Sequence, residues 1–273
     1  MSFRRNLLTG EPIVFSPERA ARPRAFLDDA TALTCPFCPG HEHETPPSLA
    51  VAGEPWRVRV FANKYPSVTG AEVIVEAAEH EARFEDVDHA ADVVAMYVER
   101  YRAHSDAAYV SLFKNEGAAA GSSIPHLHSQ VMPLPFVPPR VTRELAGFRD
   151  ACPLCARPGE VIVETEHFTW LAPHASWMPY QQWLVPKRHA CEMTALDGAA
   201  LAELASLLRA SAGKMRTLAP AFNWMFLNFP REPQAHWYVD LFPRMTTIAG
   251  FELGTGTFVE IIDPAAAARQ FRS

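Results

Sequence analysis

Apolar and polar positions along the chain follow two periods, which predict β-strands and helices. Residues 56–61 alternate between apolar and polar side chains, as in a half-buried strand. Over residues 87–104 and 201–218, apolar side chains recur at helical spacing, so each segment is expected to form an amphipathic helix packed on a sheet. Further strands are predicted over residues 12–16, 72–76, 107–114, 131–134, 161–164, 168–172, 182–186, 223–229 and 236–242.

The order of these elements repeats once along the chain. Each copy begins with a C-x-x-C motif, continues through strands to a histidine, and reaches a second histidine after its helix. The two histidines lie 46 residues apart in the first copy and 47 in the second. A Pro-rich segment, residues 136–150, separates the copies as a linker. We therefore expect an α+β protein with two tandem duplicated domains, residues 1–140 and 141–273, each an antiparallel sheet with a packed helix.

The cysteine pattern predicts two metal sites. Four of the five cysteines form the two C-x-x-C motifs, a spacing that usually reflects metal or redox chemistry. Two thiolates and two imidazoles suit a tetrahedral Zn²⁺ ion in a closed structural site. A single histidine is more often a surface residue than a ligand, but matching positions in two copies favour ligation. The predicted ligands are Cys35, Cys38, His80 and His126 in the first copy, and Cys152, Cys155, His189 and His236 in the second.

A glycine-rich segment that leads into His-x-His-x-Gln carries the candidate chemistry. Small residues in such a loop can present backbone N–H groups to a phosphate, and the candidates are Gly121, Ser122 and Ser123. His128 is the candidate nucleophile, because a neutral imidazole can attack phosphorus and form a phosphoramidate. Gln130, on the same face as His128, would stabilise charge on the phosphate oxygens.

The second copy lacks this nucleophile. When the copies are aligned, Tyr238 takes the place of His128. Asp240 takes the place of Gln130. One active centre per chain is therefore expected. Its parts fit nucleotidyl transfer in two steps, in which His128 attacks the α-phosphorus of a nucleoside diphosphate compound and a second phosphate group then accepts the nucleotide.

Composition excludes several classes of partner. The net charge is −6 and the basic residues are dispersed, so we expect no nucleic-acid partner. No apolar run is long enough to span a membrane, and the first residues do not form a signal peptide, so no membrane partner is expected. With 273 residues and 48% hydrophobic content, the chain can bury a sizeable core. A cytoplasmic location is expected.

Several motifs together resemble the galactose-1-phosphate uridylyltransferase family, which belongs to the histidine-triad superfamily. They are residues 4–23, the C-x-x-C motif within 35–40, and the segment 115–130. Residues 236–238 and 250–256 resemble the ADP-glucose phosphorylase branch of that family. The resemblance covers most of the chain, and it implies that both domains are histidine-triad-like, with the catalytic site in the first.

This resemblance also implies a substrate and further site residues. The substrate would be a nucleotide sugar, a UDP- or ADP-hexose, and the acceptor a hexose 1-phosphate or phosphate. Arg19 and Arg22 resemble arginines near the nucleotide phosphates, while Asn63 and Asn115 resemble nucleotide-site asparagines. Glu252 resembles an acceptor for sugar hydroxyls. The family is typically dimeric, so we expect a homodimer with residues of both subunits at each site.

The sequence departs from the commonest family motif at two positions. Leu127 stands where Pro is usual, and Ser129 stands where Gly is frequent. In the ADP-glucose phosphorylase branch the acceptor is inorganic phosphate, so the base and the acceptor stay open. Two other functions also remain as alternatives: a nucleotide hydrolase of the histidine-triad type, in which water accepts the nucleotide, and a non-catalytic, zinc-stabilised nucleotide-binding protein.

Overall fold

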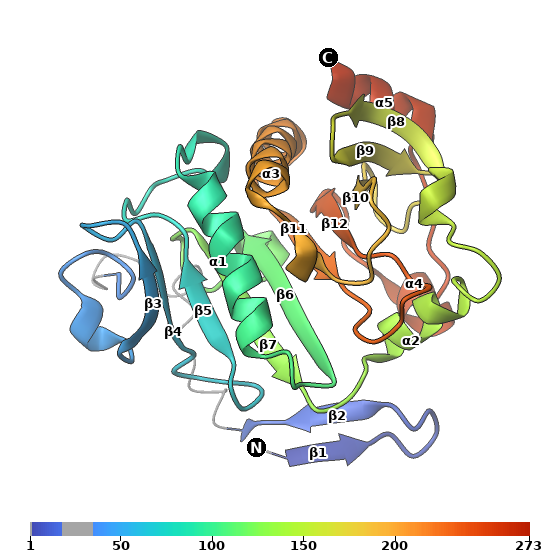
Figure 1. Ribbon diagram of the computed structural model, residues 1–273. Coiled ribbons are helices and arrows are strands. Elements are labelled where there is room, and N and C mark those ends of the chain that lie inside the picture. Colours follow the sequence, from blue (N-terminus) through green and yellow to red (C-terminus); the bar gives the residue numbers. More distant parts are fainter. Residues whose placement is uncertain (1, 18–34) are drawn as a thin grey trace.

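A ten-stranded sheet forms the centre of the protein (Figure 1). The structure is a computed structural model, and it describes residues 2–17 and 35–273. The strands of this sheet are β3 (Ser48–Ala52), β4 (Val58–Ala62), β5 (Glu72–Val75), β6 (Tyr109–Glu116), β7 (His128–Leu134), β8 (Gly159–Glu164), β9 (Phe168–Pro173), β10 (Gln182–Pro186), β11 (Phe222–Leu227) and β12 (Tyr238–Pro243). Their spatial order is β3-β4-β5-β7-β6-β11-β12-β10-β9-β8, and all neighbours are antiparallel.

The sheet consists of two copies of one five-stranded unit. From one edge the order is β3-β4-β5-β7-β6, and from the other edge it is β8-β9-β10-β12-β11, so the copies meet where β6 pairs with β11. The registers also agree: Val73 pairs with Gln130 in the first copy, and Trp183 pairs with Asp240 in the second. The predicted α+β fold with tandem duplicated units is confirmed. The boundary after residue 140 stays a prediction, because one sheet runs through both copies.

A line of directly paired residues crosses both copies and relates their sites. It runs through Phe61, Val73, Gln130, Phe113, Met225, Asp240, Trp183 and Leu171. Residues that pair directly across strands point to the same face of a sheet. Gln130 and Asp240 therefore share one face, and three strand spacings place them roughly 14 Å apart.

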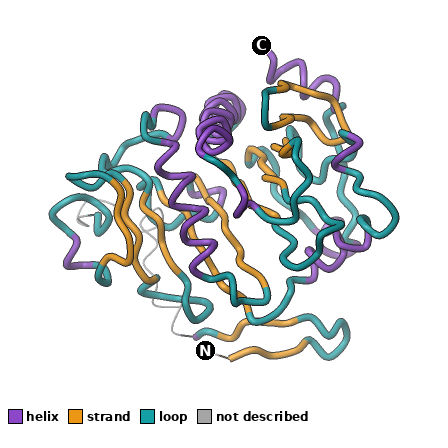
Figure 2. Tube along the Cα trace, viewed as in Figure 1, coloured by secondary structure: helices purple, strands orange, loops and turns teal. Residues whose placement is uncertain are grey.

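Two helices cover the other face of the sheet. α1 (Ala90–Ala103) and α3 (Gly198–Leu218) pack against each other there (Figures 1 and 2). Tyr97 of α1 and Leu208 of α3 are fully buried in the core between helices and sheet. α3 begins after Asp197, whose carboxylate accepts a hydrogen bond from the backbone N–H of Ala200 and so caps the helix. Both helices were predicted, although α3 begins at Gly198 rather than at residue 201.

Some elements were not predicted. The expected linker contains α2 (Pro139–Ala146), because proline is favoured in the first turn of a helix and here begins one. The other unpredicted elements are α4 (Gly250–Thr255), α5 (Pro264–Arg272), strand β3, and β1 (Ser2–Arg5), which pairs with the predicted β2 (Pro12–Phe15) in a separate hairpin. Short 3₁₀ helices are η2 (Glu42–Glu44), η3 (Phe84–Asp86), η4 (Ala118–Ala120), η5 (Leu154–Ala156) and η6 (Met193–Ala195).

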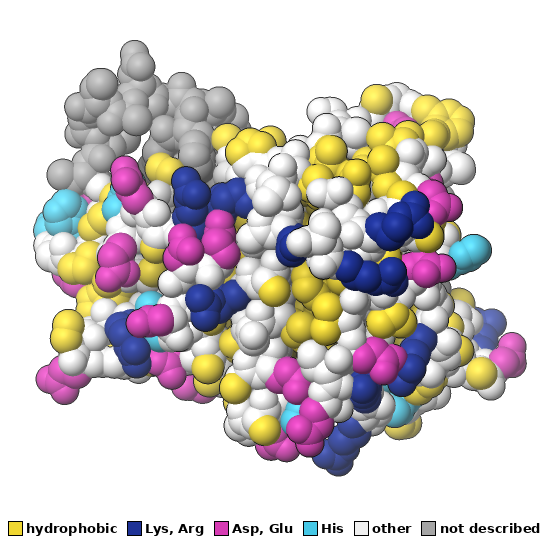
Figure 3. All heavy atoms as spheres, turned by 90° about the horizontal axis from the view of Figure 1, so that it is seen from above, with side chains coloured by type: hydrophobic (Ala, Val, Ile, Leu, Met, Phe, Trp, Pro, Cys, Tyr) yellow, Lys and Arg dark blue, Asp and Glu magenta, His cyan; other side chains and the backbone are white. Residues whose placement is uncertain are grey.

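The surface carries charges of both signs. Figure 3 shows basic and acidic side chains mixed over the face seen from above. Across residues 2–17 and 35–273, the structure contains no helix with the length and apolar character needed to cross a membrane.

Candidate functional site

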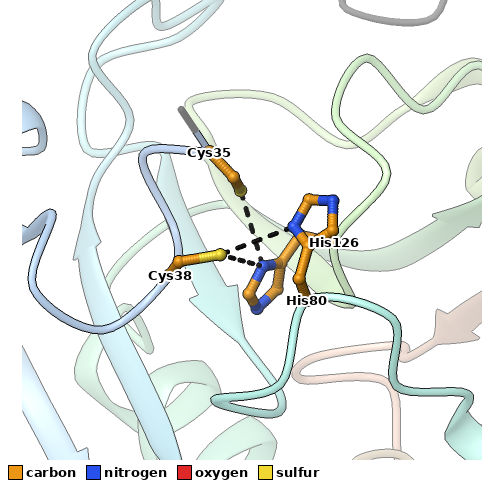
Figure 4. Close-up of side chains that lie close together, drawn as sticks. All are labelled: Cys35, Cys38, His80 and His126. Atoms are coloured by element: carbon orange, nitrogen blue, oxygen red, sulfur yellow. Dashed lines mark hydrogen bonds between the residues drawn. The ribbon is translucent and has the colours of Figure 1, made fainter. Parts of the chain in front are cut away.

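The four predicted ligands of the first copy converge beside the start of β7 (Figure 4). Cys35 and Cys38 lie on one turn, His80 follows β5, and His126 precedes β7. Their ligand atoms all lie within 4.8 Å of one another. The Sγ–Nδ1 distances are 3.5 Å for Cys35 and His126, 3.5 Å for Cys38 and His80, and 3.7 Å for Cys38 and His126. A thiolate and an imidazole that share a tetrahedral ion are expected about 3.5 Å apart, so this cluster can hold a metal ion.

Hydrogen bonding and burial prepare the first cluster for a cation. His126 Nε2 donates to the carbonyl oxygen of Ala77 at 2.8 Å, which leaves the lone pair on Nδ1, the atom that faces the sulfurs. Burial lowers the pKa of His126, so its imidazole is neutral, as a ligand must be. Burial raises the pKa of Cys35 to about 11, so a bound cation would be needed to stabilise the thiolate.

The second cluster repeats this geometry at the other end of the sheet. His236 Nδ1 lies 3.6 Å from the Sγ atoms of both Cys152 and Cys155, and His189 Nδ1 lies 3.3 Å from Cys155 Sγ. His189 Nε2 donates to the carbonyl oxygen of Pro233 at 2.9 Å, again leaving Nδ1 as the ligand atom. Burial, followed by the nearby His189, lowers the pKa of His236 to about 4. Both Cys2His2 clusters can therefore hold metal ions.

His128 is the first residue of β7 and is not a member of the metal cluster. Its Nδ1 donates to the backbone carbonyl of His126 at 2.7 Å. The ring of Phe37 packs edge-on against it at 5.3 Å between centroids. In a neutral imidazole with hydrogen on Nδ1, Nε2 carries the lone pair that a nucleophile needs. The segment that holds the metal cluster thus also fixes the tautomer of His128.

Polar groups gather beside His128 on the same face of the sheet. Gln130 is 4% exposed, and its Oε1 has no hydrogen-bond partner among the described residues. Asn115 lies two residues beyond Phe113, which pairs with Gln130. The amide of Asn223 donates to Asn115 Oδ1 at 2.8 Å and to the carbonyl of Ala120 at 3.0 Å. An unpartnered buried amide atom is costly, and the two ends of an amide exchange by rotation, so Gln130 is suited to contact a polar ligand.

The glycine-rich loop is more closed than the sequence suggested. Gly117 has φ of 81°, and an added Cβ would lie only 2.9 Å from the side chain of Ala221, so glycine is required there. The backbone N–H groups of Ala120, Gly121 and Ser122 donate to carbonyls inside the loop. These N–H groups therefore stabilise the loop itself, so those of Gly121 and Ser122 are already paired, contrary to the expectation that they would face a phosphate. Ser122 also donates its hydroxyl to the carbonyl of Ile124, at 3.0 Å.

A buried ionic network behind β7 was not predicted. Lys114 Nζ lies 2.5 Å from Glu76 Oε2, both side chains are 0% exposed, and Nζ also lies 3.4 Å from the carbonyl oxygen of His128. The other oxygen of Glu76 accepts hydrogen bonds from the hydroxyls of Tyr97 and Ser129. These side chains lie on the face of the sheet that α1 and α3 cover.

The second copy has no counterpart of this ion pair. Lys114 pairs with Ser129 across β6 and β7, and the corresponding pair across β11 and β12 is Phe226 with Val239. Because buried charges are costly, a buried ion pair at this position in only one copy calls for a reason that is specific to that copy. No sequence motif marks these residues, since their meaning depends on burial.

Known proteins resemble this chain over its whole length. ADP-glucose phosphorylase from Arabidopsis thaliana is 30% identical over 98% of this chain and 92% of its own length. Galactose-1-phosphate uridylyltransferase from Thermotoga maritima is 27% identical over 100% of this chain and 98% of its own length. The chain belongs to the galactose-1-phosphate uridylyltransferase family. The crystal structure of the Arabidopsis thaliana phosphorylase with bound ADP-glucose has a TM-score of 0.84 and 30% identity, and the match covers 100% of this chain and 98% of that one. No protein-family model matches the chain.

The remaining residues predicted from the uridylyltransferase family resemblance are Asn63, Glu252, Arg19 and Arg22. Asn63 follows β4, and its side chain accepts a hydrogen bond from the backbone N–H of Tyr65 at 2.9 Å, which shapes the turn. Glu252, in α4, lines a small cavity formed by second-copy residues, among them Trp177. Arg19 and Arg22 lie outside the described residues.

Proposed function

We propose that this member of the uridylyltransferase family is a nucleotidyltransferase that acts on a nucleotide sugar through a covalent nucleotidyl group on His128. The donor would be a UDP- or ADP-hexose, and the acceptor a hexose 1-phosphate or phosphate. The observation that carries this proposal is the hydrogen bond from His128 Nδ1 to the carbonyl of His126, which sets the tautomer with a lone pair on Nε2. Metal ligation by His126 would hold that carbonyl in place.

The proposed reaction has two displacement steps. In the first, His128 Nε2 attacks the α-phosphorus of the nucleotide sugar, and a phosphorus–nitrogen bond forms while the bond from that phosphorus to the bridging oxygen breaks. The hexose 1-phosphate leaves. In the second step, an oxygen of the acceptor phosphate attacks the same phosphorus, the phosphorus–nitrogen bond breaks, and the imidazole is regenerated. One site can serve both steps because leaving group and acceptor are both phosphates.

The surrounding polar residues would bind the phosphate and balance its charge. Gln130, with an unpartnered amide oxygen among the described residues, would rotate its N–H₂ toward a phosphate oxygen. Asn115, Ser122 and Ser123 are proposed to bind the nucleotide. For the same site, Asn63, Arg19 and Arg22 are proposed on the family resemblance, and Gly121 is proposed as part of the glycine-rich loop.

We propose zinc as the metal in both Cys2His2 clusters. Four nitrogen and sulfur ligands with no open position are typical of structural zinc, so neither ion would bind substrate. The zinc at the first cluster would supply folding energy and fix the segment from His126 to His128. This chain's own imidazole, and not the ion, would perform the displacement.

The assembly and location also remain part of the proposal. Glu252 lines a cavity in the second copy, and the family resemblance implies that residues of both subunits form each site. We therefore propose a homodimer that shares residues between its sites. We also propose a cytoplasmic location and a domain boundary after residue 140.

Trapping the covalent intermediate tests the main proposal. The protein is incubated with UDP-glucose or ADP-glucose labelled at the α-phosphate, and the adduct is located by mass spectrometry. We expect an acid-labile label on His128, none in His128→Ala, and normal labelling in His174→Ala, since His174 is exposed and outside the proposed site. If no UDP- or ADP-hexose labels the protein, the proposal is wrong.

A second measurement separates the acceptors. The labelled protein is divided and treated with inorganic phosphate, with hexose 1-phosphates, or with buffer alone. Similarity to ADP-glucose phosphorylase favours release of ADP by phosphate. Release in buffer alone, at the same rate as with either acceptor, would instead identify a hydrolase.

A further inference from the structure

A cavity of about 500 Å³ lies over the second copy of the sheet, on the face opposite α1 and α3. Tyr238 of β12 and Trp183 of β10 form part of its wall. Tyr238 occupies the position that His128 has in the first copy, as the strand registers show. The cavity therefore corresponds, within the duplicated fold, to the region around His128.

Aromatic rings form part of the cavity wall. They belong to Phe148, Trp177, Trp183, Tyr238 and Phe258. The indole N–H groups of Trp177 and Trp183 donate to the buried carboxylate of Asp240 at 3.3 and 3.2 Å. The rings of Trp183 and Tyr238 lie 5.1 Å apart between centroids. The indoles are thus anchored by their N–H edges, and a planar ligand would meet rigid aromatic surface.

Positive charge is available at one side of the cavity. Arg140 is fully engaged, since it donates to Asp240 and to Glu144 at 2.7 Å each. Arg143, one turn further along the lining surface of α2, has a side chain that is 73% exposed. Its ion pair with Glu11 is 3.8 Å long and lies in solvent, so it is weak. Arg143 is therefore the cation that a ligand at this cavity can bind.

We propose that this cavity binds a nucleoside monophosphate, with its base against the aromatic wall and its phosphate at Arg143. Aromatic side chains stack on bases of any sequence, and a guanidinium group pairs with phosphate. A volume of about 500 Å³ suits a small-molecule site. The choice of a nucleotide rests on the proposed function, because the cavity is the duplicate of the proposed nucleotide site.

The ligand is held here without being transferred. The hydroxyl of Tyr238 donates to Glu144 at 3.1 Å, and Asp240 is saturated by its four donors. The phenol of Tyr238 is not a nucleophile like the imidazole of His128, and the carboxylate of Asp240 is not a donor like the amide of Gln130. The cavity is therefore a binding site that is distinct from the reacting centre.

Equilibrium dialysis with radiolabelled AMP tests the cavity. Ala175 is exposed on its wall, so Ala175→Trp fills the entrance with little risk to folding. Ala202→Trp, at an exposed position of α3, is the matched control. We expect Ala175→Trp to bind one AMP fewer per chain than the wild type, and Ala202→Trp to bind the wild-type number. Equal AMP binding by all three proteins would overturn the proposal.

Two further variants test how the ligand is oriented. AMP should bind the cavity more tightly than adenosine, and Arg143→Gln should remove that difference. Phe258→Ala should weaken AMP binding roughly tenfold, because one stacking surface is lost. Equal affinities for AMP and adenosine in the wild type would overturn the assigned phosphate contact.

The outcomes separate this inference from the proposed enzyme. If no label forms on His128 but Ala175→Trp still binds one AMP fewer than the wild type, the cavity is supported and the proposed enzyme is contradicted. Label on His128 together with unchanged AMP binding in Ala175→Trp supports the enzyme and overturns the cavity. If Ala175→Trp changes the sedimentation coefficient but not AMP binding, the surface joins two chains and the inference is wrong.

Discussion

Replacement of Lys114 by methionine tests whether the buried network behind β7 stabilises the fold as an ion pair. Lys114 and Glu76 are 0% exposed, with 2.5 Å between Nζ and Oε2. Burial alone would lower the pKa of Lys114, but the carboxylates of Glu76 and Glu116 outweigh it and raise the pKa. The amine is therefore charged at neutral pH. Its stabilisation is fully present below the ordinary lysine pKa of 10.5 and is lost only as pH rises above the raised value.

The expected loss of stability follows from the contacts that remain in Lys114→Met. Methionine keeps most of the side-chain volume, so little cavity is created. Glu116 keeps Arg216 as a partner at 3.1 Å. Glu76 keeps the two hydroxyl donors but loses Lys114, its ion-pair partner among the described residues. Breaking one partner of a buried pair costs about 3–5 kcal/mol, and at roughly 2–4 °C per kcal/mol the melting temperature should fall by about 10 °C.

A double-mutant cycle measures the coupling. Unfolding free energies are obtained from urea titrations of the wild type, Lys114→Met, Glu76→Gln and the double variant. Because the double variant contains no unpaired charge, we expect it to be more stable than Lys114→Met, with a coupling energy of roughly 2 kcal/mol or more. If the two single effects simply add, the pair does not act as an ion pair and the reasoning is refuted.

Other perturbations test the first metal cluster, the amide of Gln130 and the buried carboxylate of Glu72. Elemental analysis should find two zinc ions per chain in the wild type and one in Cys35→Ser, with a lower melting temperature; equal zinc in both would contradict the first site. Gln130→Ala should slow transfer of the nucleotide by roughly 10²–10³-fold in single-turnover assays while the label still forms on His128; an unchanged rate would contradict its role. Burial raises the pKa of Glu72, but hydrogen bonds from His104 and Arg100 outweigh it and leave the pKa below the ordinary 4.5. Its stabilisation is therefore present above pH 4.5 and lost as pH falls through the lowered pKa. The difference in unfolding free energy between wild type and Glu72→Gln should accordingly shrink in acid, and a constant difference would contradict this.

The two Cys2His2 clusters could be predicted because their pattern occurs twice in the sequence. A lone His80 or His189 carries little information, but both recur at the same place relative to a C-x-x-C motif and a helix. Strands and long helices were also predictable, since their apolar periodicity reflects which side faces the core. α2 was missed because its proline-rich start matches a linker equally well, and only packing of Val141 in the core decides for a helix.

Residues whose contacts depend on burial could not be recognised from the local sequence. Lys114 lies within a predicted strand, where a lysine usually points to solvent, and only the packing of α1 over the sheet removes it from water. Asn223 is similar, because its contact with Asn115 exists only where β11 joins β6. The contact of Asn223 depends on the union of the two copies, and neither copy's sequence reveals how they join.

The difference between the two copies links this network to the chemistry. Both halves of a duplicated fold bury a core at the same place. In the second copy, Phe226 and Val239 fill the core at the position that Lys114 and Ser129 have in the first copy. The first copy instead buries Lys114 opposite Ser129, with Nζ 3.4 Å from the carbonyl of the very residue proposed as the nucleophile. Stability alone does not require a buried ion pair, because an apolar pair is often equally stable. The copy that lacks the imidazole has an apolar pair at this place, so we infer that the ion pair holds the backbone at His128 in position.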